Sequence, residues 1–155
     1  PEGGPGRGSD YVRHLAETIK PLVDARFRTL PQRATTGVAG SSMGGLISLF
    51  AFFDRPDVFG IVGALSPSLW FAERAIFGLL EAAPSRPGRL YLDAGRLEGA
   101  ETIENARRLR DLLRAKGYVQ GAQLRYVEDR GGKHEEAAWG RRFRAALPFL
   151  LSSSE

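Results

Sequence analysis

Residues 37–45 of this 155-residue chain read GVAGSSMGG, and the apolar run LISLFAFF follows at positions 46–53. Residues 33–40 are short, partly β-branched and uncharged after Arg33, which is typical of a buried strand. The run from Met43 to Phe53 is apolar almost all round, which is typical of a buried helix. The stretch therefore predicts a strand, a tight turn and a helix, with two serines at the turn. The alternative is a flexible glycine-rich loop with two capping serines.

The same strand-then-helix order recurs along the rest of the chain. Apolar or β-branched runs predict three more strands, at 59–66, 89–95 and 123–129. Helices are expected after each of them: within 67–83, at 101–116 with Gly117 ending it, and near the C-terminus with Trp139, Phe143, Leu147 and Leu150 on one face. A further helix is expected from Ser9 or Asp10, and Pro21 should kink or end it.

This alternation predicts a three-layer α/β/α fold with a mainly parallel sheet and right-handed crossovers. Residues 1–8 hold four glycines and two prolines, so a flexible tail is expected there and one domain over 9–155. In such sheets function collects at the carboxyl ends of the strands. Polar residues that follow the strands are therefore the candidates for a site.

The charge pattern argues against a nucleic-acid-binding protein. The net charge is +4 and the pI is 9.8, but only three of the 22 basic residues are lysines and the arginines alternate with acids. The densest basic cluster, at 107–114, is better explained by a solvated helix face.

Cysteine is absent, which excludes disulfides and thiol catalysis. No apolar stretch approaches the ~20 residues of a membrane span, and no signal peptide is visible. The chain begins without Met, as a cut end would, so the compartment stays open with the cytoplasm slightly favoured.

Ser42 is the candidate nucleophile, because GSSMG at 40–44 is a G-x-S-x-G motif between a predicted strand and a predicted helix. Flanking glycines allow a strained turn in which strand and helix approach closely. The amide of Met43, at the helix N-terminus, is then placed to stabilise an oxyanion.

Only two histidines are available as the base that a serine nucleophile needs. His14 lies in the first predicted helix, far from any strand end. His134 follows the fourth predicted strand in a glycine-rich loop, where an imidazole can reach back over the sheet. His134 is therefore the candidate base.

The acid that orients the imidazole should follow the third strand, because the chain order in this arrangement is serine, acid, histidine. Glu98 is chosen because it stands in the loop beyond the strand end. Asp93, Glu101 and Glu104 remain alternatives, and Glu128 and Asp129 are more distant ones.

Residues after the second strand should line the same rim. Trp70, in SPSLW at 66–70, is a candidate substrate-binding residue together with Ser41, although a packing role for Trp70 is at least as good. Trp139 is at helical spacing with Phe143 and is expected in the core.

Five segments together resemble the esterase family of the α/β-hydrolase superfamily, which includes enterochelin esterases, S-formylglutathione hydrolase, feruloyl esterases and mycolyltransferases. They are SDYVRHLAETIKPLVDARFRT, GSSMGGLISLFAFFDRPDVFG, LSPSLW, YLDAGRLEG and GGKHEEAAW, and the resemblance covers residues 9–151. The enterochelin-esterase-like branch is the nearest match. The resemblance implies a serine esterase with Ser42 as nucleophile, His134 as base and Glu98 as acid.

The resemblance also implies several earlier strands, one of which donates a second oxyanion amide, and these are missing from the 155 residues. The chain is expected to be the C-terminal portion of an α/β-hydrolase fold with an exposed sheet edge, through which it would associate or pair with an N-terminal segment. Loss of one oxyanion donor lowers turnover by about 100-fold to 1,000-fold, so the fragment alone should be weakly active or inactive.

The expected partner is a small-molecule ester, with no cofactor, metal, membrane or nucleic acid. A non-catalytic α/β-hydrolase-like binding or assembly module is the alternative. A phosphate-binding loop is a third reading, but the Lys-Ser/Thr pair of a P-loop is absent.

Overall fold

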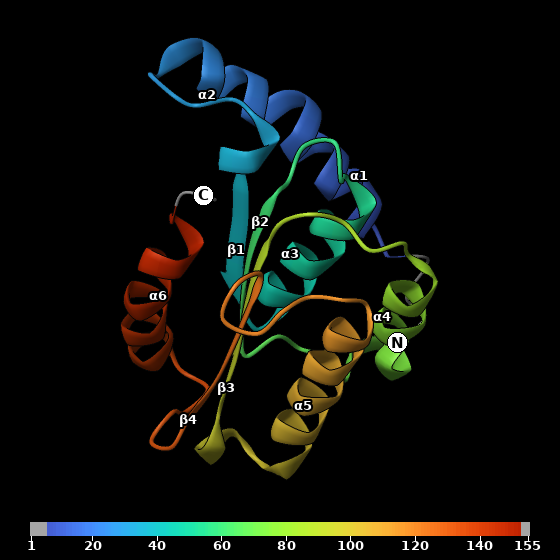
Figure 1. The fold of residues 1–155 in the computed structure, drawn as a ribbon, viewed down its shortest axis with the longest axis vertical. Coiled ribbons are helices and arrows are strands. Elements are labelled where there is room, and N and C mark those ends of the chain that lie inside the picture. The colour runs from blue at the N-terminus through green and yellow to red at the C-terminus, as the bar shows by residue number, and fades with distance from the viewer. Residues whose placement is uncertain (1–5, 153–155) are drawn as a thin grey trace.

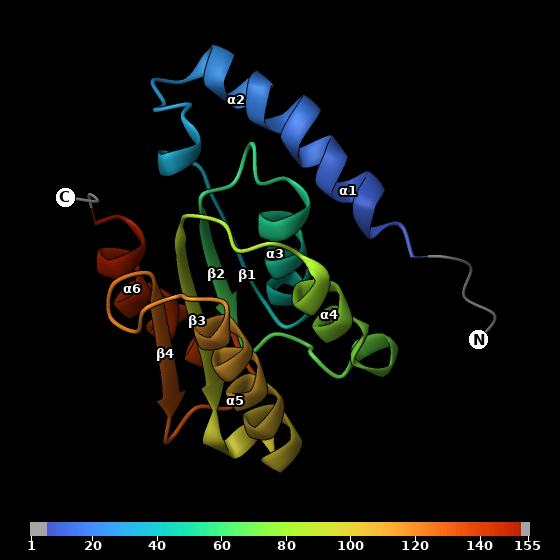
Figure 2. The same ribbon diagram turned by 45° about the vertical axis from the view of Figure 1, so that its right-hand side comes forward.

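The computed structural model describes residues 6–152 and contains one four-stranded parallel sheet. The strands are β1 (Gly37–Ser41), β2 (Ile61–Leu65), β3 (Arg89–Gly95) and β4 (Leu124–Asp129), and they lie side by side in chain order. The arrowheads in Figures 1 and 2 point to the same end of the sheet. The loops that follow the four strands therefore gather at the carboxyl end of the sheet, as the sequence predicts.

Helices cover both faces of the sheet, so the predicted α/β fold class is confirmed. Three of them, α3 (Met43–Asp54), α4 (Phe71–Ala82) and α5 (Ala100–Ala115), share one face (Figures 1 and 2). Each connects neighbouring parallel strands, which places successive crossovers of one hand on one side of the sheet. The last helix, α6 (Glu136–Leu150), packs alone on the opposite face.

The larger core lies under the three helices. It joins Phe52 of α3, Phe77 of α4 and Leu109 of α5 to Val62 and Leu90 of the sheet, all of them at most 1% exposed. All five residues of β2 are buried, which fits a central parallel strand covered on both faces. This packing fixes where the strands end and hence where the loops that carry polar residues begin.

The strand boundaries differ little from the predicted ones, and the largest difference is at the first strand. Residues Arg33–Thr35 form a 3₁₀ turn, η2, and β1 begins only at Gly37. The hydroxyls of Thr35 and Thr36 both bond to the carbonyl of Gln32, and such local bonds compete with the strand ladder.

Pro21 does not end the first helix, which is the part of the prediction that is wrong. Helical structure runs through α1 (Gly8–His14), a π-helical segment η1 (Leu15–Ile19) and α2 (Lys20–Arg26). Pro21 is the second residue of α2, and the irregularity stands just before it, where wider π turns replace the ordinary α-helical ladder. The helix therefore continues past the proline. Of the expected tail, residues 1–5 lie outside the described part, and Gly8 already belongs to α1.

The predicted inward face of the last helix is right at Trp139 and Leu150 but wrong at Phe143. The structure buries Ala138, Arg142, Ala146 and Leu150, whereas Phe143 is 37% exposed. The alanines allow the helix to lie close to the sheet, and the guanidinium of Arg142 finds acidic partners beneath it. An arginine therefore occupies a position that hydrophobic periodicity assigns to an apolar residue.

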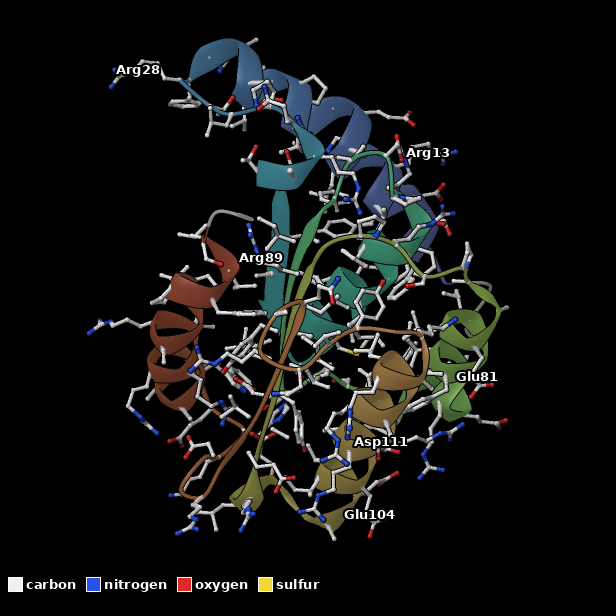
Figure 3. All side chains as sticks on the ribbon, viewed as in Figure 1. Arg13, Arg28, Glu81, Arg89, Glu104 and Asp111 are labelled. Atoms are coloured by element: carbon white, nitrogen blue, oxygen red, sulfur yellow. The ribbon has the colours of Figure 1, made fainter. Side chains whose placement is uncertain are left out.

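Several charged side chains on α4 and α5 lie outside the core. Glu104 and Asp111 point away from α5 in Figure 3, and so does Glu81 from α4. None of the helices within residues 6–152 has both the length and the apolar character that a membrane span requires.

Candidate active site

The turn between β1 and α3 holds Ser42 in an unusual backbone conformation. Its φ is 56° and its ψ is −121°, values that a residue with a side chain rarely adopts. The turn is possible because Gly40 has no side chain: a Cβ there would lie 2.6 Å from the carbonyl carbon of Gly44. The glycines thus let the helix start directly against the strand, and the serine stands at the bend.

A chain of hydrogen bonds links Ser42, His134 and Glu98. The Oγ of Ser42 lies 2.9 Å from Nε2 of His134, and Nδ1 of the same ring lies 2.9 Å from Oε2 of Glu98. The imidazole side chain is 45% exposed, whereas the Glu98 side chain is 1% exposed. The structure therefore brings together the three residues that the sequence predicts for the site, with Glu98 buried and His134 open to solvent.

The partners of the imidazole define its tautomer. A carboxylate oxygen accepts hydrogen bonds, so Nδ1 carries a hydrogen and Nε2 is free to accept one from Ser42. The single hydrogen of the Ser42 hydroxyl is then directed to His134. Ser68, whose Oγ lies 3.1 Å from the Oγ of Ser42, must in turn be the donor of that contact. Ser68 is 3% exposed and so has no bulk water as a competing partner.

The other carboxylate oxygen of Glu98 is held by several donors. Oε1 accepts hydrogen bonds from the backbone N–H of Gly95 at 2.9 Å and from the hydroxyl of Ser66 at 2.6 Å. It also accepts one from Nη2 of Arg142 at 3.2 Å. These donors come from the ends of β2 and β3 and from α6. The orientation of the carboxylate is therefore set by three separate elements.

The alternative acids have other partners. Asp93 is fully buried and binds the backbone N–H of Ser66, the hydroxyl of Tyr91 and the guanidinium of Arg142. Burial raises the pKa of Asp93 to about 6, against the opposing effect of Arg142. Because its oxygens are taken up by these donors, Asp93 is joined to the imidazole only indirectly, through Arg142 or Ser66 and then Glu98.

The remaining acids lie on the periphery. Glu101 forms an ion pair with Arg74, and Glu128 binds Arg96 and Arg107. Asp129 accepts a hydrogen bond from the backbone N–H of Gly131 in the loop that leads to the histidine. Glu104 is exposed on α5. Glu98 is thus the acid that the structure places against His134.

Ser41 and Met43 flank the central serine on opposite sides. Ser41 lines a pocket of about 320 Å³ with Trp139 and Phe143 of α6, and Met43 lines one of about 500 Å³ with Phe71 of α4. Trp70 is 56% exposed and its ring meets that of Phe71 edge to face. Within residues 6–152, no group of three acidic, histidine or cysteine side chains is placed to hold a metal ion.

Several residues of the site are not predicted from the sequence. Ser66 and Ser68 lie in the predicted rim segment without a role of their own, and no motif marks Arg142. Trp139 was assigned to the core, and it does pack there, but its ring also meets that of His134 at a centroid distance of 4.7 Å. A usable signal was the position of Arg142 at the spacing of buried Ala138 and Ala146.

Comparison with known proteins identifies relatives among esterases. The chain is 27% identical to the uncharacterized protein YbbA of Bacillus subtilis over 96% of its own length and 62% of that protein. It is 29% identical to the iron(III) salmochelin esterase of Escherichia coli over 86% of its own length and 35% of that protein. The chain therefore spans less than two thirds of the length of these curated relatives.

A solved structure shares the fold. The enterobactin esterase FES of Shigella flexneri, solved in the presence of 2,3-dihydroxy-N-benzoyl-serine, superposes with a TM-score of 0.81. The two are 24% identical, and the match covers 92% of this chain and 38% of that one. The sequence profile of the family described as "Putative esterase" matches residues 2–150. The chain therefore belongs to that esterase family and has an α/β-hydrolase type of fold.

Proposed function

We propose that this chain carries the serine, histidine and acid of a serine esterase, which hydrolyses carboxylic esters through an acyl-enzyme. The observation that supports this most is the continuous set of hydrogen bonds from Ser42 through His134 to Glu98. Membership of the esterase family supports the reaction class independently. The bend at Ser42 is then a nucleophile elbow.

In the first step the Oγ of Ser42 attacks the ester carbonyl carbon while Nε2 of His134 takes the hydroxyl proton. The carbonyl π bond breaks and its electron pair moves to oxygen, which gives a tetrahedral oxyanion. When the carbonyl re-forms, the bond to the alcohol oxygen breaks, and the alcohol leaves with the proton held by His134. Ser42 is left acylated.

In the second step the same groups act on water. Nε2 of His134 takes a proton from water as the water oxygen attacks the acyl carbon. The tetrahedral intermediate then expels the Oγ of Ser42. The serine recovers its proton from His134, and the carboxylic acid product departs. The net reaction is ester plus water to acid plus alcohol, without any other reactant.

Glu98 and Met43 supply charge stabilisation in this scheme. The Glu98 carboxylate holds Nδ1–H in place and stabilises the imidazolium that forms when His134 accepts the proton. Met43 begins α3 directly after Ser42 in the chain, so its backbone N–H has no partner within the helix and is free to bind a developing oxyanion. That amide is the proposed oxyanion donor.

The substrate class is proposed from the relatives. Two curated relatives that match 86% of this chain are named as esterases of iron(III) salmochelin and ferri-bacillibactin, and two shorter matches are named as siderophore esterases. Siderophore esters are therefore the first class to test, beside simple aryl and alkyl esters. The pockets lined by Ser41 and Met43 are where the acyl and alcohol parts of such a substrate would lie.

A fluorophosphonate probe tests the proposal directly, because it reacts with an activated serine hydroxyl. The complete protein should be labelled, and peptide mapping should place the label on Ser42 and not on the adjacent Ser41. Ser42→Ala and His134→Gln should abolish labelling. His14→Gln is the matched control, because His14 is exposed on α1 and should have no effect.

Two outcomes would contradict the proposal. Absence of label from the complete, folded protein, with esters untouched, would favour a non-catalytic binding module. Label on a serine other than Ser42 would show a hydrolase that uses a different site.

A further inference from the structure

Arg142 is a buried arginine in the middle of α6. Its side chain is 5% exposed, which is rare for an arginine unless its charge is paired. Its Nε donates to Oδ2 of Asp93 at 3.1 Å, and its Nη2 donates to the Oγ of Ser66 at 2.6 Å and to Oε1 of Glu98 at 3.2 Å. One guanidinium thus connects two buried carboxylates and one buried hydroxyl.

The planar fork of arginine suits this arrangement better than any other side chain. Nε and Nη2 point in directions fixed by the guanidinium plane, so binding Asp93 through one nitrogen fixes where the other points. Asp93 is itself fixed by the hydroxyl of Tyr91 and the backbone N–H of Ser66. The ends of β2 and β3 therefore set the position of Nη2, and with it the position of Glu98 Oε1.

Glycines make room for the guanidinium between two loops. A Cβ at Gly132, in the loop before His134, would meet Nη1 of Arg142, and one at Gly95 would meet the carbonyl of Gly132. That carbonyl accepts a hydrogen bond from the N–H of Leu97 at 3.0 Å. This bond ties the loop that carries Glu98, here called the acid loop, to the loop that carries His134, here called the histidine loop. Arg142 lies under the junction of the two loops.

We propose that Arg142 is a positioning residue of the ester-hydrolysing site: it holds Oε1 of Glu98 so that Oε2 faces His134, with Asp93 as the anchor that aims the guanidinium. The inference rests on the proposed function, and it extends the site to two residues, Arg142 and Asp93, that contact neither the reacting serine nor the imidazole.

The charges of the cluster fit this role. Two buried carboxylates, Asp93 and Glu98, share one guanidinium, and the partly exposed Asp129 lies 3.7 Å from its Nη1, so an excess negative charge remains near the imidazole when these acids are ionised. When His134 becomes an imidazolium during the reaction, that excess is reduced. Burial raises the pKa of Asp93 to about 6, and the charge of Glu98 adds a smaller rise in the same direction.

Three variants separate positioning from simple charge neutralisation. Arg142→Met keeps much of the length of the side chain but removes every donor. Arg142→Lys keeps the charge but has a single nitrogen, which cannot meet Asp93 and Glu98 in the same plane. The double variant Asp93→Asn with Arg142→Met removes the buried acid together with its partner, so that no charge on Asp93 is left unpaired.

Each variant is assayed for kcat and KM on an ester that the wild-type chain hydrolyses, for thermal unfolding, and for the far-downfield NMR signal of the His134 Nδ1–H. The signal is assigned with ¹⁵N-histidine in a His14→Gln background, which leaves one imidazole. Arg142→Met and Arg142→Lys should lower kcat on the order of 100-fold with little change in KM, and should lose the downfield signal.

The double variant distinguishes positioning of Glu98 from simple neutralisation of Asp93. It should regain thermal stability over Arg142→Met while kcat stays low and the signal stays absent. Recovery of wild-type kcat and of the signal would overturn the proposal, because Arg142 would then only neutralise Asp93. If the complete wild-type protein hydrolyses no ester, the proposed function fails, and the NMR signal still reports whether Arg142 positions Glu98.

Discussion

Nε2 of His134 lies 2.9 Å from the Oγ of Ser42, although 92 positions separate the two residues in the chain. Ser42 follows β1, at one edge of the described sheet, and His134 follows β4, at the other. The loop that leaves β4 must therefore reach back across the ends of two strands. Its junction with the acid loop, through Gly132 and Leu97, holds it in that path.

Replacement of the histidine should abolish turnover while leaving binding intact. His134→Gln removes the proton acceptor of Ser42, and kcat should fall by a factor on the order of 10⁴ to 10⁶ with KM little changed. Steady-state kinetics on an activated ester measures this. His14→Gln should match the wild type, and an equal loss in both variants would show that the decrease comes from somewhere other than the site.

Replacement of the acid should have a smaller but still large effect. Glu98→Gln keeps the size of the side chain but removes the negative charge that holds Nδ1–H, and kcat should fall on the order of 10⁴-fold. Glu101→Gln, on the exposed first turn of α5, is the matched control and should be neutral. A large loss in Glu101→Gln with none in Glu98→Gln would transfer the role to Glu101.

Ser68 should contribute modestly to the same reaction. Ser68→Ala removes the hydrogen bond that its hydroxyl donates to Ser42, which is worth about 1 kcal/mol or a few-fold to 10-fold in kcat. Thermal unfolding run in parallel separates this from loss of structure. An increase in kcat would mean that Ser68 restrains the nucleophile in an unproductive orientation.

The glycine motif should respond with opposite signs at two positions. Gly40→Ala places a Cβ against the backbone of Gly44 and should destabilise the chain by more than about 2 kcal/mol. Gly44→Ala meets no atom within 4 Å and lies in α3, so it should stabilise by about 0.5–1 kcal/mol. Urea unfolding of the two variants makes the comparison, and equal effects would mean that the bend is not as tightly packed as described.

Glu128 should make the stability depend on pH in the acidic range. Its hydrogen bond with Arg107, together with contacts from Tyr126 and Arg96, lowers its pKa from an ordinary 4.5 to about 2. A lowered pKa in the folded state means that the stabilisation is present above pH 4.5 and is lost as the pH falls toward 2.

The matching variant is Glu128→Gln, which should lower the unfolding free energy by about 1–2 kcal/mol at pH 7 because the two arginines are partly exposed. The difference from wild type should disappear near pH 2. Glu104→Gln, on the exposed face of α5 (Figure 3), should show no difference at either pH. A difference for Glu128→Gln that persists unchanged at pH 2 would contradict the assignment.

The sequence alone determined the class of fold and three residues of the candidate site, because each had a local signal. Apolar periodicity predicts the strands and helices, and the alternation of strand and helix along the chain then leaves few topologies open. Ser42 lies in a recognisable motif, His134 is one of only two histidines, and Glu98 is the acid beyond the third strand end. None of these required knowledge of long-range contacts.

The tertiary structure alone decided what holds those residues in place. Arg142 is one arginine among many in the sequence, and its helical spacing with Ala138 and Ala146 does not name its partners; its burial depends on Asp93 and Glu98, which lie 49 and 44 positions earlier. The hydroxyl of Ser66 gains Glu98 as a partner only because β2 and β3 end side by side, and that of Ser68 gains Ser42 only because β1 and β2 do. Such contacts depend on distances between elements, and local patterns in a chain carry no record of them.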